Sequence, residues 1–367
     1  MSNYIEYNDQ MVFHPGYYLK EIVDESGLTQ EDFAKRLGTT PKNLSILLKG
    51  DQSLSIDIAS KLSRMLGTTI AYWLDLQQAY DEKLAEIRSD EELEKEKEVF
   101  KLIDYKYFRD YFKLPDLPRQ TDKQIKHVRE FLSVSSLTVL EEKNLAVNFR
   151  SYSENLSRSN TVNANVMVQI AVNQTLRKEI PKFNKKKFEN AVSFALTQTK
   201  NHKSFLFELQ RAFEEAGVVL VALPNLKNSG INGASKKVDG KVMLMVNDRR
   251  HYADTFWFTL FHEIGHILNG DLGVSFKGEK EDEADLYAQR ALIPQEKYEA
   301  FVNENRWFDE STIVRFADSI DRDPGIVLGR LLIDEKVPLS DTVLSKRLRH
   351  TYDVVIGQYV QTYVKNT

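Results

Sequence analysis

Residues 256–271 read FWFTLFHEIGHILNGD, and His262, Glu263 and His266 form the pattern H-E-x-x-H inside this stretch. Residues four apart lie about one turn from each other on a helix, so both imidazoles project from one face and can bind one ion. Neutral imidazole suits Zn²⁺, which predicts a zinc site; the alternative is a buried helix with two structural histidines. Glu263, beside the first ligand, can reach a water on the metal.

The residues around this pattern predict a buried helix. They are apolar on nearly the whole helical circumference, and unpaired polar groups there would cost about 1–3 kcal/mol each unless a metal relieved them. We expect Asp254 or Thr255 to cap the start of the helix and Asn269–Gly270 to end it.

A third ligand is available on a second predicted helix, EKEDEADLYAQRALIP, which Pro294 ends. Its small residues recur at i, i+4 and i+7 (Ala284, Ala288 and Ala291), so this face can approach the first helix closely. Glu281 and Asp285 flank that face, whereas Glu283 points away by roughly 160°. We therefore assign Glu281 as third ligand and Asp285 as the acceptor that orients one histidine. The alternative is that these acids only stabilise the start of this helix, where carboxylates interact favourably with the helix dipole.

This arrangement predicts a hydrolytic mechanism. Zinc held by His262, His266 and Glu281 would polarise a scissile carbonyl and acidify its water, and Glu263 would take the proton of that water. No oxyanion-stabilising residue is assigned, since Tyr252 and His251 are only nearby in sequence.

These two helices resemble the ImmA/IrrE family of zinc metallopeptidases, and the likeness extends upstream through GVVLVALPNLKNSGINGA. The resemblance covers residues 216–294 firmly and residues 120–215 and 295–350 more loosely. The chain matches the family pattern at His262, Glu263, His266, Glu281, Asp285, Ala288, Leu292 and Pro294. The resemblance implies a zincin-like fold with peptidase activity against a transcriptional repressor or antitoxin.

Residues 27–50, GLTQEDFAKRLGTTPKNLSILLKG, have helix-turn-helix form. Thr29 caps a first helix, Gly38 makes the turn, and a second helix starts near Thr40–Pro41. Ala34 is small where the two helices must cross. The segment resembles the Xre/HigA class of repressors and antitoxins, including the lead-in HPGYYLKEIVDESGLTQEDFA.

The predicted DNA contacts lie at the start of the second helix. Thr40, Pro41, Lys42 and Asn43 would face base edges in the major groove, and Gln30 and Lys49 would reach phosphates. Residues 1–75 hold ten Asp or Glu against seven Lys or Arg, which favours modest DNA binding or binding as a homodimer. A plain helical bundle or a protein-binding module is the alternative.

The spacing of residues 33–48 recurs in FADSIDRDPGIVLGRLL, residues 316–332. This recurrence predicts a second unit of helix-turn-helix packing. Its aspartates would repel phosphates, so we interpret it as structural or protein-binding.

The whole chain has 367 residues, a net charge of −4 and no cysteine, which excludes disulfides, thiolate metal sites and cysteine nucleophiles. It shows no signal peptide and no apolar run of about 20 residues, so we expect a cytoplasmic protein without membrane contact. The fold class is mainly α with a small α+β unit. The predicted segments are a DNA-binding domain (1–80), a charged helical connector (81–120), a helical middle region (121–215), a zincin-like peptidase core (216–294) and a helical C-terminal region (295–367).

The function predicted from these segments is a regulator that binds a double-stranded DNA operator and carries a zinc endopeptidase. The peptidase would cleave a repressor or antitoxin. The alternative is a non-catalytic, antitoxin-like repressor whose zinc-site domain binds a repressor, antitoxin or toxin protein.

Overall fold

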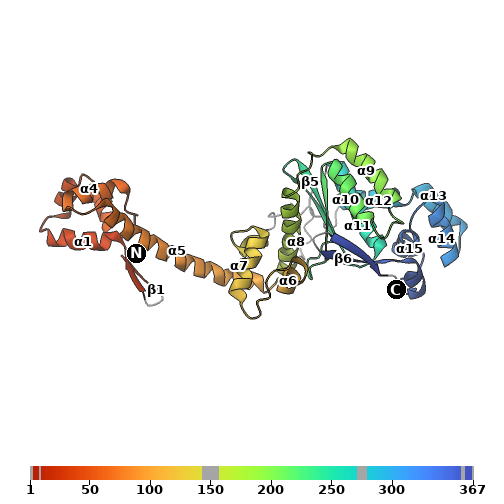
Figure 1. The fold of residues 1–367 in the computed structure, drawn as a ribbon, viewed down its shortest axis with the longest axis horizontal. Helices are drawn as coiled ribbons and strands as arrows, with labels where there is room; N and C mark the ends of the chain where they lie inside the picture. The colour runs from red at the N-terminus through yellow and green to blue at the C-terminus, as the bar shows by residue number, and fades with distance from the viewer. Residues whose placement is uncertain (1–2, 8–9, 143–156, 271–278, 357–359, 366–367) are drawn as a thin grey trace. The chain divides into compact units, whose positions relative to one another are not determined.

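The structure of the protein, a computed structural model, describes residues 3–7, 10–142, 157–270, 279–356 and 360–365 (Figure 1). The chain forms two compact units, Met1–Lys95 and Glu96–Thr367. The predicted fold class, mainly α with a small α+β unit, is confirmed. Every helix in the described ranges is too short or too polar to cross a membrane.

The first unit is a bundle of short helices behind an N-terminal hairpin. Its elements are β1 (Tyr4–Tyr7), β2 (Gln10–Phe13), α1 (Pro15–Glu25), α2 (Gln30–Leu37), α3 (Pro41–Leu48), α4 (Ile56–Leu66) and most of α5 (Ile70–Phe100). The strands are antiparallel, and Tyr4 pairs with Phe13. The bundle buries one core that includes Leu19, Phe33, Ala34, Leu44, Leu62 and Trp73.

The local signals of the helix-turn-helix are confirmed in the structure. Thr29 caps α2 by accepting a hydrogen bond from the Asp32 amide, and Thr40 caps α3 in the same way. Gly38 joins the helices with φ +74°, a left-handed conformation that favours glycine. Pro41 stands in the first turn of α3, where its missing amide hydrogen costs nothing.

The second unit contains the remaining elements. They are α6 (Tyr105–Phe112), α7 (Thr121–Leu132), η1 (Leu137–Glu141), α8 (Arg158–Leu176), α9 (Lys185–Thr197), α10 (Phe205–Glu215), β3 (Val218–Leu223), β4 (Gly233–Val238), β5 (Lys241–Asn247), α11 (Ala253–Asn269), α12 (Glu279–Leu292), α13 (Gln295–Glu304), α14 (Glu310–Ser319), α15 (Pro324–Ile333), α16 (Thr342–Leu348), β6 (Thr351–Ile356) and β7 (Val360–Lys365). The last residues of α5 also belong to this unit.

A three-stranded sheet with the order β3-β5-β4 organises the second unit. β5 runs parallel to β3 and antiparallel to β4. Every residue of β3 and β5 is buried, because α8 packs on one face of the sheet and α10 and α11 pack on the other (Figure 1). Strands covered on both faces are continuous apolar runs, which is why VVLVAL and KVMLMVN lack a polar alternation.

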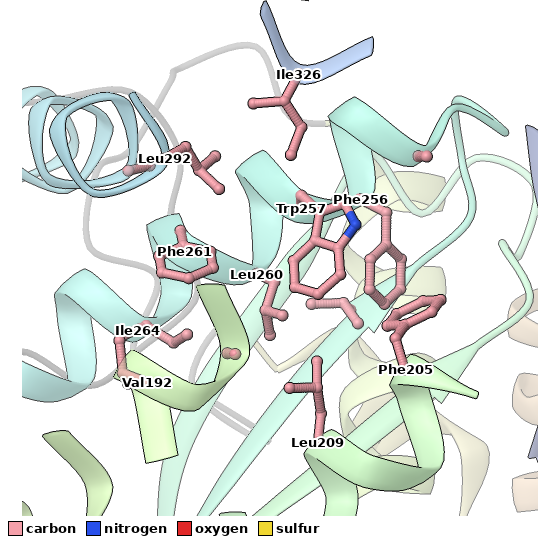
Figure 2. Close-up of a cluster of buried hydrophobic side chains, with 14 of the residues drawn as sticks. Val192, Phe205, Leu209, Phe256, Trp257, Leu260, Phe261, Ile264, Leu292 and Ile326 are labelled. Carbon is pink, nitrogen blue, oxygen red and sulfur yellow. The ribbon is translucent and has the colours of Figure 1, made fainter. Parts of the chain in front are cut away.

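The core beneath α11 holds that helix against the sheet. Figure 2 shows Phe205 of α10 close to Phe256 and Trp257 of α11, and the ring centroids lie 5.5 and 5.1 Å apart. Leu209 and Leu260 are fully buried in the same cluster. This packing fixes the face of α11 that carries the two histidines.

Two sequence-based expectations about the second unit are wrong. The glycine-containing stretch NSGINGAS, residues 228–235, reads as a loop between two strands, but residues 233–238 form β4, because pairing with β5 overrides the glycine and the polar residues. The C-terminal region was expected to be helical, but after α16 it forms the antiparallel pair of β6 and β7.

The recurring pattern at residues 316–332 forms the expected helix pair. Asp323 caps α15 as Thr40 caps α3, and Asp321 adopts a left-handed conformation, φ +52°, at the position equivalent to Gly38. The two sequences therefore encode the same local turn in different parts of the fold.

Candidate metal centre and nucleic-acid interface

Helix α11 carries the H-E-x-x-H pattern within the core of the second unit. It ends as expected at Gly270, which is left-handed with φ +74°. Its start differs from the prediction, because Tyr252 is the N-cap residue and makes no side-chain cap. Asp254 is instead buried and binds Arg349 through both carboxylate oxygens, at 2.9 and 2.8 Å. Burial, the largest cause, raises the pKa of Asp254, and Arg349 opposes that shift.

The two histidines converge on one point. His262 Nε2 and His266 Nε2 lie 3.1 Å apart, and the ring planes are inclined at 78°. Two nitrogen ligands of a tetrahedral zinc lie about 3.3 Å apart, given Zn–N bonds of about 2.05 Å. The donor atoms and their spacing therefore fit a zinc ion.

Asp285 of α12 lies behind the first histidine. Its Oδ1 is 2.7 Å from His262 Nδ1 and accepts a hydrogen bond from it. This bond places the proton on Nδ1 and leaves the Nε2 lone pair directed at His266. The side chain of Asp285 is 47% exposed, and that of His262 is 14% exposed.

Small residues allow α12 to approach α11. Ala284 and Ala288 are fully buried, as their spacing predicted. A Cβ on Gly265 would lie 3.1–3.3 Å from Tyr287, so this glycine also permits the close contact. Glu283 is exposed. Glu281 belongs to α12, but its side chain lies outside the described residues.

Glu263 is 1% exposed and lies against β4. A Cβ on Gly233 would come within 2.8 Å of Glu263 Cγ and 2.9 Å of Glu263 Oε1. Gly233 therefore leaves the space that the carboxylate occupies. Sequence reasoning missed this residue, and the glycines of NSGINGAS were its only signal.

The two residues near the helix start have other surroundings. The guanidinium of Arg349 lies 3.6 Å from the ring centroid of Tyr252, and Tyr252 pairs with Thr351 in an isolated β-bridge. His251 is exposed and has φ +56°. Neither observation assigns an oxyanion-stabilising role.

A cavity of about 330 Å³ reaches Asp285, the hydrogen-bond partner of His262. Asp285 and Thr259 line it on the side of the two histidines, and its other charged residues are Asp254, Arg250 and Arg330. Its remaining wall is largely apolar, with Phe258, Leu292, Ile293, Ile326 and Ile333. The cavity can therefore take an apolar side chain close to Asp285.

In the first unit, the residues expected to contact DNA are all exposed: Gln30, Thr40, Pro41, Lys42, Asn43 and Lys49. Thr40 Oγ1 also accepts a hydrogen bond from the Asn43 amide at 3.1 Å, so this hydroxyl caps the helix in addition to facing solvent. Lys61 donates to the Gly38 carbonyl at 3.1 Å and pairs with Asp57, which stabilises the turn. The start of α3 is thus held rigidly with its outer face open to solvent.

Comparisons with known proteins match both units. Residues 19–73 match a family model described as helix-turn-helix, and residues 213–319 match one described as IrrE N-terminal-like domain. The chain is 32% identical over 80 residues to virulence-associated protein I of Dichelobacter nodosus, an alignment that covers 22% of this chain and 74% of that protein. It is 35% identical over 66 residues to the uncharacterized HTH-type transcriptional regulator YddM of Escherichia coli (strain K12), covering 18% of this chain and 70% of that protein. Among solved structures, an addiction module antidote protein of the HigA family from Coxiella burnetii is 34% identical, covers 23% of this chain and 91% of that chain, and has a TM-score of 0.21.

Proposed function

Because the chain belongs to the helix-turn-helix regulators and carries an IrrE-like domain, we propose that it is a DNA-binding regulator with a zinc-dependent endopeptidase. The substrate class is a repressor or antitoxin protein. The observation that carries the enzymatic half is the pair of Nε2 atoms 3.1 Å apart, with His262 oriented by Asp285.

His262, His266 and Glu281 would hold the zinc ion. Glu281 is proposed as the third ligand because it precedes Asp285, whose carboxylate reaches His262, by four positions in the sequence of α12. When bound, zinc supplies Lewis-acid chemistry that polarises a carbonyl and lowers the pKa of a water molecule. Asp285 keeps Nδ1 of His262 protonated, so the imidazole presents its other nitrogen.

Glu263 moves the proton in this proposal. It accepts the proton of the attacking water and passes it to the leaving amine of the scissile peptide. Gly233 gives its carboxylate space, and the wall of β4 limits its alternative positions. The cavity lined by Phe258 and Leu292 would receive an apolar side chain of the substrate next to the scissile bond.

The DNA-binding half rests on α3. Its capped start presents Thr40, Pro41, Lys42 and Asn43 to solvent, the position from which a recognition helix reads the major groove. Gln30 and Lys49 would contact phosphates on either side. Since acids outnumber bases in this unit, we expect binding as a homodimer with a strong dependence on salt.

Incubating the full chain with repressors encoded beside its gene tests the enzymatic half. The wild type should retain zinc and cleave one of them. Glu263→Gln should retain zinc and lose cleavage by at least about a hundredfold, because a carboxamide cannot accept the proton. Glu283→Gln, an exposed change on α12, is the matched control and should cleave normally.

Two outcomes would contradict this proposal. Cleavage by Glu263→Gln at the wild-type rate would remove its role as general base. Tight binding of a repressor without cleavage by the zinc-loaded wild type would favour a non-catalytic regulator whose zinc-site domain binds its partner.

A further inference from the structure

A second group of metal-ligating side chains lies in the second unit, apart from the H-E-x-x-H helix. His202 belongs to the turn before α10, Asp323 caps α15, and His350 directly precedes β6. His202 Nε2 lies 3.0 Å from Asp323 Oδ2, and His350 Nε2 lies 3.7 Å from the same oxygen. The two imidazole centroids are 3.8 Å apart. Three segments distant in sequence thus bring their donor atoms to one point.

The carboxylate at the centre of this group is positioned by its surroundings. Asp323 is 2% exposed, and its Oδ1 accepts a hydrogen bond from the Gly325 amide at 2.8 Å. A Cβ on Gly325 would lie 2.8 Å from Asp323 Oδ1 and 2.9 Å from the Leu348 carbonyl oxygen, so this glycine permits the close approach of the segment that carries His350. Oδ2 is consequently the oxygen that faces both imidazoles.

Charge favours a cation at this point. The carboxylate of Asp254, which is also buried, acts electrostatically on Asp323, and Arg349 pairs with Asp254. With neutral imidazoles, the charges of Asp254, Asp323 and Arg349 sum to −1. A buried negative charge is costly, and a cation held by the ring nitrogens and the Asp323 carboxylate would offset it.

The donor set and its spacing fit zinc. All three ligand atoms lie within 4.8 Å of one another. The two spacings to Asp323 Oδ2, 3.0 and 3.7 Å, bracket the roughly 3.3 Å expected between ligands of a tetrahedral zinc. His202 Nδ1 lies 3.0 Å from the hydroxyl of Tyr352, whose oxygen can accept a hydrogen bond from Nδ1–H when Nε2 binds a metal.

We propose that His202, Asp323 and His350 form a second zinc site with a structural role. The ion joins the turn before α10, the start of α15 and the start of β6, and thereby clamps the C-terminal helices to the peptidase core. The side chains of His202 and His350 are 18% and 35% exposed, so an ion can enter from solvent. The competing arrangement is a proton-mediated cluster, in which an imidazolium pairs with Asp323 and no metal binds.

Zinc stoichiometry of the full chain, measured by native mass spectrometry and metal analysis, tests this proposal. We expect two equivalents in the wild type. His262→Ala/His266→Ala should keep one equivalent, and His202→Asn/His350→Asn should also keep one, while the combination of all four changes should keep none. His127→Asn, at a half-buried histidine of α7 away from both sites, is the matched control and should retain both.

A second readout uses the folded His262→Ala/His266→Ala protein alone, so it does not depend on the folding of the other variant. Cobalt should give a visible absorption band typical of tetrahedral coordination. Chelator should lower the melting temperature, and added zinc should restore it, because an ion bound only by the native state stabilises that state.

The proposal is overturned if His262→Ala/His266→Ala binds no zinc or cobalt and its melting temperature ignores chelator. That result would identify the proton-mediated cluster. The outcome is separable from the proposed peptidase function, since zinc at the H-E-x-x-H helix and cleavage are measured on His202→Asn/His350→Asn.

Discussion

Gly233→Ala should displace Glu263, the proposed general base, without removing the proposed metal ligands. The added Cβ would lie 2.8 Å from Glu263 Cγ and 3.0 Å from Thr259 Cγ2. The closer contact is about 0.6 Å short of the 3.4 Å at which ordinary van der Waals contact begins. Either Glu263 or β4 must move by that distance, and both are buried.

The size of the effect follows from this displacement. A catalytic group misplaced by about 1 Å can cost a hundredfold in rate, so we expect cleavage to fall by roughly tenfold to a hundredfold. Overpacking of a buried site should also lower the free energy of unfolding by about 1–3 kcal/mol. Zinc content should stay at the wild-type level, because the atoms nearest to the new methyl group belong to Glu263 and Thr259 and not to His262 or His266.

Single-turnover cleavage, zinc content and thermal unfolding of the full chain measure these three quantities. Gly240→Ala is the matched control, since Gly240 lies in the turn between β4 and β5 with φ +77°, and the atoms nearest to an added Cβ belong to the flexible side chain of Lys182. The free energy of unfolding of this variant should fall by about 1 kcal/mol through backbone strain, and its cleavage rate should stay at the wild-type level. A wild-type rate for Gly233→Ala would refute the reasoning, and loss of zinc would show that β4 positions the ligands rather than the base.

Three further predictions concern the metal centre, the DNA contacts and the first helix. Asp285→Ala should weaken zinc binding about 10- to 100-fold in a competition assay, because His262 loses the acceptor that orients it. Glu283→Ala should bind zinc normally, and equal losses in the two variants would contradict the role given to Asp285. Asn43→Ala should reduce discrimination between an operator and scrambled DNA, whereas Lys49→Ala should weaken binding to both alike, as measured by fluorescence anisotropy at several salt concentrations. His14 is buried, and its Nδ1 accepts from the Gly16 amide; its pKa is lowered from 6.5, chiefly by burial. The unfolded state therefore binds more protons than the folded state at acidic pH. The stability that His14 contributes to the first unit should be fully present above pH 6.5 and should fall as the pH drops through the lowered pKa. His14→Asn should flatten this pH dependence in thermal unfolding.

The helix-turn-helix and the histidine pair could be predicted because each depends on neighbours in sequence. A Thr cap acts on an amide three residues later, Gly38 supplies a left-handed turn, and His262 and His266 share a face at a spacing of four. Such relations need no knowledge of the rest of the fold. The small-residue face of α12 was predictable for the same reason, since Ala284 and Ala288 recur at helical spacing.

Other features were decided by partners far along the chain. Asp254 was expected to cap α11, yet it binds Arg349, 95 residues later, because both charges are buried together. β4 exists through its pairing with β5, and only that pairing brings Gly233 against Glu263.

Tertiary structure also decided what Asp323, which belongs to the recurring pattern at residues 316–332, contacts. The recurrence at residues 316–332 predicted helix-turn-helix packing, and in the structure Asp323 caps the second helix of that pair, α15. Its second oxygen meets His202 and His350 only because α15, the turn before α10 and the start of β6 converge. Local sequence determines dihedral angles and caps within a few residues, whereas burial and long-range packing determine which charged groups must share one site.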